Sequence, residues 1–193
     1  MRIDRLGAHR LGGSACGARA KKFHFEGVVR LGPYADPLRS AVLRIKNQSA
    51  QALAIVLGDL LAVECSQQLT ALEPDVVVPI PMHWSRRMWR GTNSSETVAE
   101  RLSRSLGVPS ASHHLARCRR TVPQARLSAT RRVANVRGAF RARSHADLPG
   151  ARVLLVDDIM TTGATANEAA KTLRRAGAAA IVIVVLARAE GLG

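Results

Sequence analysis

The sequence contains little cysteine and few aromatic residues, and both scarcities exclude classes of protein. Only three cysteines occur among the 193 residues, and they lie far apart: Cys16, Cys65 and Cys118. This spacing excludes a disulfide-rich scaffold and a zinc site of the C-x-x-C type, and it is typical of a reducing compartment. The six aromatic residues are too few for a surface that stacks single-stranded nucleic acid.

Long hydrophobic segments and the common nucleotide-binding glycine motifs are absent as well. The longest apolar run, residues 178–187, is too short to cross a bilayer and predicts a buried strand. The basic N-terminus lacks the hydrophobic segment of a signal peptide before Ser14. Neither G-x-x-x-x-G-K-[ST] nor G-x-G-x-x-G occurs. We therefore expect a cytoplasmic protein with no membrane partner and no common nucleotide loop.

Acidic residues are scarce, and the basic excess is concentrated in one region. The chain has 29 basic and 14 acidic residues, a net charge of +15. Residues 84–143 hold 14 Arg and two acidic residues, a local charge of +12, whereas residues 151–193 hold five basic and four acidic residues. A concentrated positive field predicts an anionic partner: a phosphorylated metabolite, nucleic acid or an acidic protein.

The pattern along the chain divides it into three segments. Residues 1–22 have no periodicity and are rich in Gly and basic residues, which predicts a mobile basic tail. Residues 23–72 contain an alternating stretch and a short amphipathic helix after Pro37. A further helix over 51–69 is apolar nearly all round, so we expect it to be buried on most faces. We expect residues 73–193 to form the main core.

Strands and helices alternate in this core. Continuous apolar runs predict buried strands over 75–80, 152–157 and 180–187. A helix is expected over 165–176, with Gly177 as its C-terminal cap. This alternation predicts an α/β fold, a mostly parallel sheet with helices on both faces.

The region between the first two of these strands has one clear helix signal. Asn93 followed by Glu96 has the spacing of a capping box and predicts the start of a helix. Residues 110–145 are Arg-rich and only weakly periodic, which predicts a long loop. A long loop inside a compact domain is usually functional or disordered.

The stretch VLLVDDIMTTGAT, residues 153–165, joins a buried strand to a group of polar residues. It places Asp157 and Asp158 at the expected carboxyl end of the strand, where open α/β sheets bind ligands. The Thr–Gly turn that follows can direct several N–H and hydroxyl groups at one phosphate. Thr165, with Glu168 three residues later, predicts a helix N-terminus that attracts the same anion. Carboxylates repel phosphate but bind sugar hydroxyls or Mg²⁺, so the pattern predicts a sugar-phosphate site.

This stretch closely resembles the phosphoribosyl pyrophosphate (PRPP) binding signature of type I phosphoribosyltransferases. The wider chain is similar to the ComF family, a phosphoribosyltransferase-like group named for competence and DNA uptake. Four stretches within residues 27–187 carry the resemblance: GVVRLGPYADPLRSAVLRIK, DVVVPIPMHWSRRMWRGTN, RTVPQARLSATRRVANVRGAF and VLLVDDIMTTGAT. It implies a type I phosphoribosyltransferase-like fold in which residues 23–72 form a small N-terminal hood and residues 73–193 form the core.

The resemblance also assigns roles to individual residues. Two carboxylates would contact the ribose hydroxyls and hold Mg²⁺, the implied cofactor: Asp157 and Asp158. The 5-phosphate would be held by the turn residues Thr161, Thr162, Gly163, Ala164 and Thr165. The pyrophosphate loop would contain Pro81, Arg86 and Arg87. Candidates to neutralise the departing pyrophosphate are Arg119, Arg120, Arg131 and Arg137; Arg131 and Arg137 join the two aspartates as catalytic candidates.

Two features depart from the family pattern. Many relatives begin with paired cysteines of the zinc-ribbon type, whereas residues 1–22 contain only Cys16. Two explanations stay open: the zinc module is missing, which would make this segment a remnant of a zinc ribbon, or the chain is truncated. With three scattered cysteines we expect the chain to hold no structural zinc. A Gln that commonly follows the Asn of the family's G-x-N motif is replaced by Ser94.

Two functional hypotheses follow. The first is a Mg²⁺-dependent phosphoribosyltransferase linked to competence and DNA uptake, which displaces pyrophosphate from PRPP or binds another ribose 5-phosphate ligand. The second is a non-catalytic module that senses PRPP or binds DNA or a DNA-uptake helicase. The complete motif over 157–165 favours the first hypothesis. The local charge of +12, and the lack of a recognisable acceptor-base pattern in residues 23–72, favour the second.

Overall fold

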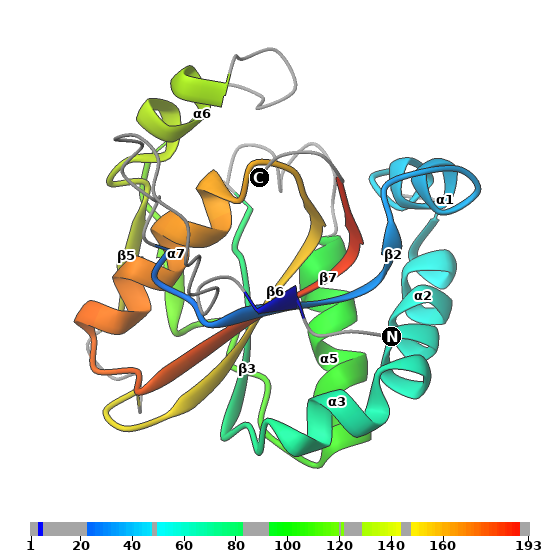
Figure 1. Ribbon diagram of the computed structural model, residues 1–193, viewed down its shortest axis with the longest axis horizontal. Helices are drawn as coiled ribbons and strands as arrows, with labels where there is room; N and C mark the ends of the chain where they lie inside the picture. Colours follow the sequence, from blue (N-terminus) through cyan, green and yellow to red (C-terminus); the bar gives the residue numbers. More distant parts are fainter. Residues whose placement is uncertain are drawn as a thin grey trace, which may run out of the picture.

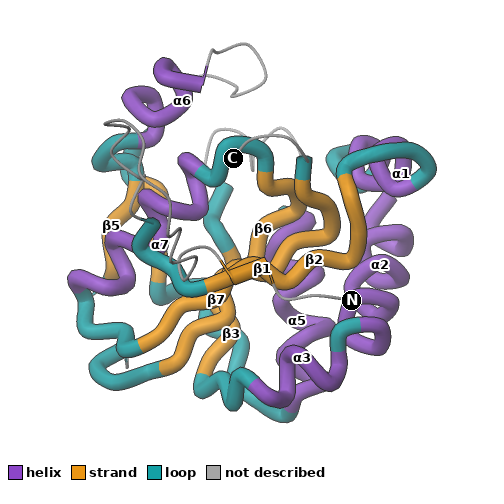
Figure 2. Tube along the Cα trace, in the orientation of Figure 1, coloured by secondary structure: helices purple, strands orange, loops and turns teal. Residues whose placement is uncertain are grey.

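Five strands form one sheet at the centre of the protein (Figures 1 and 2). The computed structural model describes residues 4–5, 23–47, 50–82, 93–119, 121, 129–143 and 148–189. The strand order is β1–β2–β7–β6–β3, with bounds β1 (Asp4–Arg5), β2 (Gly27–Pro33), β3 (Val76–Pro79), β6 (Arg152–Met160) and β7 (Ala180–Arg188). Strand β1 is antiparallel to β2, and the other pairs are parallel. The prediction of a mostly parallel sheet is confirmed.

Helices cover both faces of this sheet, as predicted, with α7 on one side and α2, α3 and α5 on the other (Figure 1). The described helices are α1 (Leu38–Arg44), α2 (Gln51–Glu64), α3 (Ser66–Ala71), α5 (Ser94–Leu106), α6 (Ala129–Val136) and α7 (Ala164–Arg175). Asn93 caps α5 as the sequence predicts, because its side chain accepts a hydrogen bond from the backbone N–H of Ser95.

Alternation along the central strands divides the core into two layers. Leu155 of β6 packs in the layer that contains Leu173 of α7, whereas Leu154 packs in the layer that contains Leu61 of α2 and Leu102 of α5. All five side chains are at most 1% exposed. Burying a leucine side chain stabilises a fold by roughly 1.5–3 kcal/mol. The two layers therefore fix the sheet between its helices and hold its carboxyl edge in place.

The N-terminal half contributes to the same sheet. Strand β2 pairs in parallel with β7, from Gly27 opposite Val182 to Pro33 opposite Arg188. Residues 4–5 belong to the segment that the sequence assigns to a mobile tail, and they pair with β2 as β1. The assignment of residues 1–22 as a tail stays a prediction. The sheet thus draws strands from both the 23–72 and the 73–193 segments. A hood role for residues 23–72 stays a prediction.

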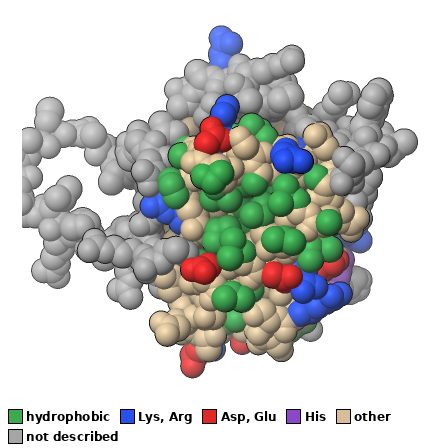
Figure 3. All heavy atoms as spheres, turned by 90° about the vertical axis from the view of Figure 1, so that its right-hand side faces the viewer, with side chains coloured by type: hydrophobic (Ala, Val, Ile, Leu, Met, Phe, Trp, Pro, Cys, Tyr) green, Lys and Arg blue, Asp and Glu red, His purple; other side chains and the backbone are tan. Residues whose placement is uncertain are grey.

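Helix α2 differs from its prediction in length and in burial. The helix expected over 51–69 is broken at Cys65, where α2 ends and α3 begins. One side of α2 is open rather than buried: Val56 is 59% exposed, Leu60 43% and Val63 70%. Figure 3 shows hydrophobic side chains gathered on this side of the molecule. The other side of α2 packs on α5 and the sheet. The prediction that this helix is buried on most faces was therefore wrong, although apolar residues occur on nearly all of its sides.

The Arg-rich region that we predicted as a long loop contains regular structure. Strands β4 (Leu115–Arg117) and β5 (Phe140–Ala142) form an antiparallel pair, and α6 precedes β5. The pair forms because Leu115 and Phe140 enter the core layer beneath α7. Short elements with one or two buried side chains each leave too little periodicity for a sequence-based prediction.

Among the described residues, no helix is long and apolar enough to cross a membrane.

Candidate functional site

Strand β6 continues beyond the two aspartates. We expected Asp157 and Asp158 at its end, but β6 runs to Met160. The reason is the neighbouring strand, since β7 pairs with β6 from Ala180 to Arg188 and keeps residues 157–160 extended. The two carboxylates therefore lie on a rigid strand, four and three residues before Thr161, where the turn begins.

The turn after β6 depends on one glycine. Gly163 has a φ of +70°, a left-handed conformation that disfavours any side chain. A Cβ atom at this position would also lie 2.8 Å from the terminal methyl carbon of Met160. Gly163 is the N-cap of α7, which begins at Ala164, so the prediction of Thr165 as N-cap was wrong. Glu168, expected in the capping box, instead accepts a hydrogen bond from the backbone N–H of Gly138 at 2.9 Å.

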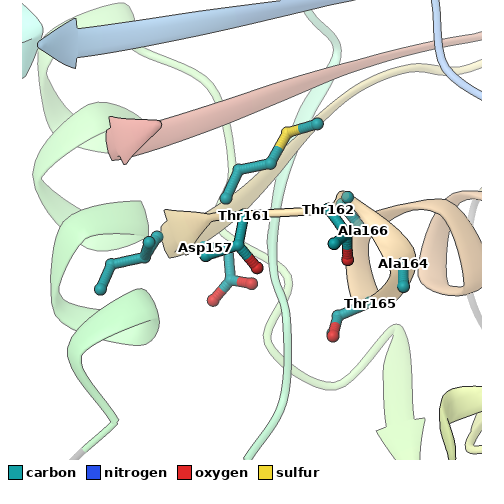
Figure 4. A pocket seen from close by; sticks show the side chains of 9 residues that line it. Asp157, Thr161, Thr162, Ala164, Thr165 and Ala166 are labelled. Atoms are coloured by element: carbon teal, nitrogen blue, oxygen red, sulfur yellow. The ribbon is translucent and has the colours of Figure 1, made fainter. Parts of the chain in front are cut away.

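The turn and the start of α7 surround a small hollow beside Asp157. Its lining contains all five residues assigned to the phosphate: Thr161, Thr162, Gly163, Ala164 and Thr165. In Figure 4 the carboxylate of Asp157 and the hydroxyl of Thr165 extend to the same side of the β6–α7 turn. The first backbone N–H groups of a helix have no partner within the helix, and the helix dipole is positive there. The hollow is therefore suited to a phosphate group next to a carboxylate.

Helix α5 holds both carboxylates from the side of β3. The hydroxyl of Ser95 donates to Asp157 Oδ1 at 3.2 Å, and the hydroxyl of Ser94 donates to Asp158 Oδ2 at 3.3 Å. Both serines are buried. At the position where we expected the family's Gln, Ser94 contacts one of the two aspartates. The N-terminus of α5 also directs its positive dipole end toward the carboxylate pair.

The two carboxylates differ in their surroundings. Burial, followed by the negative charge of Asp158, raises the pKa of Asp157 to about 7. Lys46, which lies just after α1, approaches Asp158 instead, with its Nζ 3.5 Å from Oδ2. The site therefore joins a carboxylate that resists ionisation to one that is already paired with a cation.

The expected pyrophosphate loop begins and ends at this site. Pro81 follows β3, whose Pro79 is paired with Val156 of β6. The side chain of Asn93 donates to the backbone C=O of Ile80 at 3.3 Å and so joins the two ends of the loop. Arg86 and Arg87 lie outside the described residues, as do Arg120 and residues 83–92.

A catalytic role for the two arginines expected at the reaction centre stays a prediction. Arg131 on α6 and Arg137 just after it are exposed. Neither is among the described residues that line the hollow. Arg119 donates to the backbone C=O groups of Asn135 and Arg137, both at 2.8 Å. Arg119 thus fastens the end of α6 to β4. The structure therefore brings the turn and the carboxylates together but not these arginines.

Two contributors to the site were not identified from the sequence, Lys46 and Ser95. They contact aspartates 112 and 62 positions away in the chain, both on β6. The capping position of Asn93 predicts where α5 begins, yet only the packing of α5 beside β6 shows that its first residues reach the aspartates.

Known families match this chain over most of its length. The phosphoribosyl transferase domain family matches residues 48–192, which include the carboxylate pair and the turn. Competence protein F of Haemophilus influenzae is 36% identical over 166 residues, covering 84% of this chain and 72% of that protein. DNA utilization protein YhgH of Escherichia coli is 37% identical over 167 residues, covering 83% and 71%. The chain therefore belongs to the ComF family of phosphoribosyltransferase-domain proteins.

Solved structures give weaker matches. Glutamine phosphoribosylpyrophosphate amidotransferase from B. subtilis has a TM-score of 0.46 at 28% identity, and the match covers 68% of this chain but 25% of that enzyme. A purine phosphoribosyltransferase from Pyrococcus horikoshii has a TM-score of 0.42 at 16% identity, covering 83% and 89%. These scores add nothing to the family assignment, which rests on the sequence matches.

Proposed function

We propose that the protein binds PRPP together with Mg²⁺ and transfers its phosphoribosyl group with release of pyrophosphate. The observation that carries this proposal is the hollow lined by Asp157 and residues 159–166, with the β6–α7 turn on one side and the carboxylate of Asp157 on the other, next to Asp158 on the same strand. A ligand that fits both halves carries a phosphate and adjacent hydroxyl groups. PRPP has its 5-phosphate and its ribose hydroxyls in that relation.

The residues present suit Mg²⁺. This ion prefers oxygen ligands, and in many sites it takes one or two carboxylates and completes its shell with water and substrate phosphates. Asp157 and Asp158 supply two carboxylates and leave the remaining positions to the ligand. When bound, the ion would neutralise charge on the diphosphate oxygens.

The chain's own residues would divide the remaining work. The backbone of the β6–α7 turn and the hydroxyls of Thr161 and Thr165 would fix the 5-phosphate and so orient the ribose. An acceptor nitrogen would then form a bond to C1 of the ribose, while the bond from C1 to the pyrophosphate oxygen breaks and pyrophosphate leaves with the electron pair. The proton that the acceptor nitrogen loses would pass to solvent water. Arg86 and Arg87 of the loop after β3 would stabilise the leaving charge. We keep Arg131 and Arg137 as secondary candidates for this role.

A screen for pyrophosphate release tests this proposal. The purified chain is incubated with PRPP, Mg²⁺ and, one at a time, each nucleobase or a small amine. We expect release with at least one acceptor and none from the Asp157→Asn, Asp158→Asn double variant. Release that the double variant retains would contradict the assignment of the site.

A non-catalytic role in DNA handling is the second candidate. It is favoured by the relatives named for competence and DNA utilization, and by the charge of +12 over residues 84–143. In that role the chain would sense PRPP or bind DNA or a DNA-uptake helicase. DNA binding of this kind rests on displaced counterions, so it should fall steeply between about 50 and 200 mM salt. Salt-sensitive DNA binding that ignores the aspartate changes, with no pyrophosphate release, would favour this role over the enzyme.

A further inference from the structure

Lys46 connects the first helix of the chain to the ligand site. It follows α1, and its two neighbours toward the core, Val42 and Ile45, are 0% and 4% exposed. These anchors fix the end of α1 at the carboxyl edge of the sheet. From there the Lys46 side chain reaches Asp158, although the two residues are 112 positions apart. Lys46 is one of only four lysines among 29 basic residues.

The two oxygens of Asp158 have different partners. Oδ1 accepts a hydrogen bond from the backbone N–H of Ile159 at 2.8 Å, which fixes the orientation of the carboxylate. Oδ2 faces both the Ser94 hydroxyl at 3.3 Å and the Lys46 ammonium at 3.5 Å. A divalent cation bound to this carboxylate would be attracted to the same oxygen and would repel the ammonium.

We infer that Lys46 is a positioning residue of the ligand site: it neutralises Asp158 in the free protein, and on binding it turns to an anionic oxygen of a phosphorylated pentose. This inference rests on the proposed function. It makes the α1 end part of the site rather than only a neighbour of it. Entry of metal and ligand then exchanges one pairing of Lys46 for another instead of leaving a bare carboxylate or a bare ammonium.

The chemistry of lysine suits this exchange. Its ammonium is a point charge on a flexible four-carbon stem with three donors, so it can turn between two acceptors without moving the backbone. Lysine also binds phosphate groups as a point charge. The Lys46 side chain is 29% exposed and that of Asp158 18%, so the pair lies at the rim of the site and can reach an incoming ligand.

The alternative is a plain ion pair that ties α1 to the sheet. A partly exposed pair of this kind contributes little stability. The two accounts predict different signs when the charge is removed. If the Lys46–Asp158 pair only holds the fold, its loss would weaken the binding of metal and of ligand alike. If the Lys46 ammonium competes with the metal for Asp158 and also binds the ligand, its loss would strengthen metal binding and weaken ligand binding.

Two titrations with Lys46→Met separate these accounts. Mn²⁺ binding to the free chain, followed by electron paramagnetic resonance, should become about two- to fivefold tighter because the competing ammonium is gone. PRPP binding at saturating Mg²⁺, followed by calorimetry, should become about two- to tenfold weaker. Lys46→Arg, which keeps the charge, should bind Mn²⁺ as the wild type does. Lys171→Met on α7 is the matched control and should change neither affinity.

Opposite changes in the two affinities support the inference. Weakening of both, or no change in Mn²⁺ affinity, would overturn it and leave Lys46 as a structural tie. Failure of the wild-type chain to bind PRPP would overturn the proposed function, which is a separate outcome because the Mn²⁺ titration does not involve PRPP.

Discussion

The two halves of the site are neighbours in the chain but are built in different ways. The phosphate half, residues 161–165, is one continuous turn whose geometry depends on Gly163 and the start of α7. The carboxylate half draws on three separated parts of the chain: Asp157 and Asp158 on β6, Ser94 and Ser95 on α5, and Lys46 after α1. A local half can be recognised from a motif, whereas an assembled half requires the fold. Substitutions can therefore test the two halves separately.

The largest effect is expected in the phosphate half, for Gly163→Ala. Alanine at this position would have to adopt a left-handed backbone conformation, and its Cβ would lie 2.8 Å from the Met160 methyl carbon. Backbone strain, together with the shift of the flexible but buried Met160 side chain, should lower the free energy of unfolding by about 2–3 kcal/mol, measured by urea denaturation.

Gly107→Ala is the matched control for this change. Gly107 ends α5 with a φ of +67°, close to that of Gly163, but apart from its chain neighbours no atom of the described residues lies within 4 Å of the position of its added Cβ. Only the backbone cost should appear, about 1–2 kcal/mol. Equal losses for the two variants would show that the contact with Met160 does not constrain the turn.

The next effect concerns Asp157 in the carboxylate half. Its pKa is raised from 3.8 to about 7 by burial and by Asp158, so the folded protein favours the protonated form. The wild-type chain therefore loses stability as the pH rises from about 4 to 7. Asp157→Asn lacks this loss. Its free energy of unfolding should match the wild type near pH 4 and exceed it by ~1–3 kcal/mol at pH 8.

Asp36→Asn should behave in the opposite way. The hydrogen bond from the Ser40 hydroxyl lowers the pKa of Asp36, so its contribution is present at neutral pH and lost in acid. Denaturation of both variants between pH 3 and pH 8 checks the sign. A stability advantage of Asp157→Asn that does not grow with pH would contradict the raised pKa.

The smallest effect compares two serines of α5. Ser95→Ala removes a donor to Asp157. Ser103→Ala, on the same helix, removes a hydrogen bond to the backbone C=O of Val108, which lies just beyond the end of α5. Each should cost about 0.5–1.5 kcal/mol of stability. Only Ser95→Ala should also weaken PRPP binding, by about three- to tenfold. Equal ligand affinities for the two variants would exclude Ser95 from the site.

The difference between the local half and the assembled half of the site also explains which features could be predicted from the sequence. The apolar runs of β3, β6 and β7 and the cap of α5 are local signals, and the structure confirms them. The end of β6 and the cap of α7 were misplaced because they depend on pairing with β7 and on the conformation of Gly163.

The remaining differences also have long-range causes. Strands β4 and β5 exist because each pairs with the other across 23 or more residues. The open side of α2 follows from what packs against it, which its composition does not show. Lys46 and Ser95 reach the aspartates only in the folded chain. Features that depend on neighbouring residues could therefore be predicted from the sequence, and features that depend on contacts between distant segments could not.

The central claim is that residues 157–165 form a sugar-phosphate site, and thermal unfolding with PRPP and Mg²⁺ tests it most directly. Ligand at about 100 times its dissociation constant stabilises a protein by ~2.7 kcal/mol. For a chain of this size each kcal/mol raises Tm by roughly 2–4 °C. We expect a rise of about 5–10 °C for the wild type and none for the folded Asp157→Asn, Asp158→Asn variant. No rise in the wild type, or an equal rise in the variant, would contradict the account.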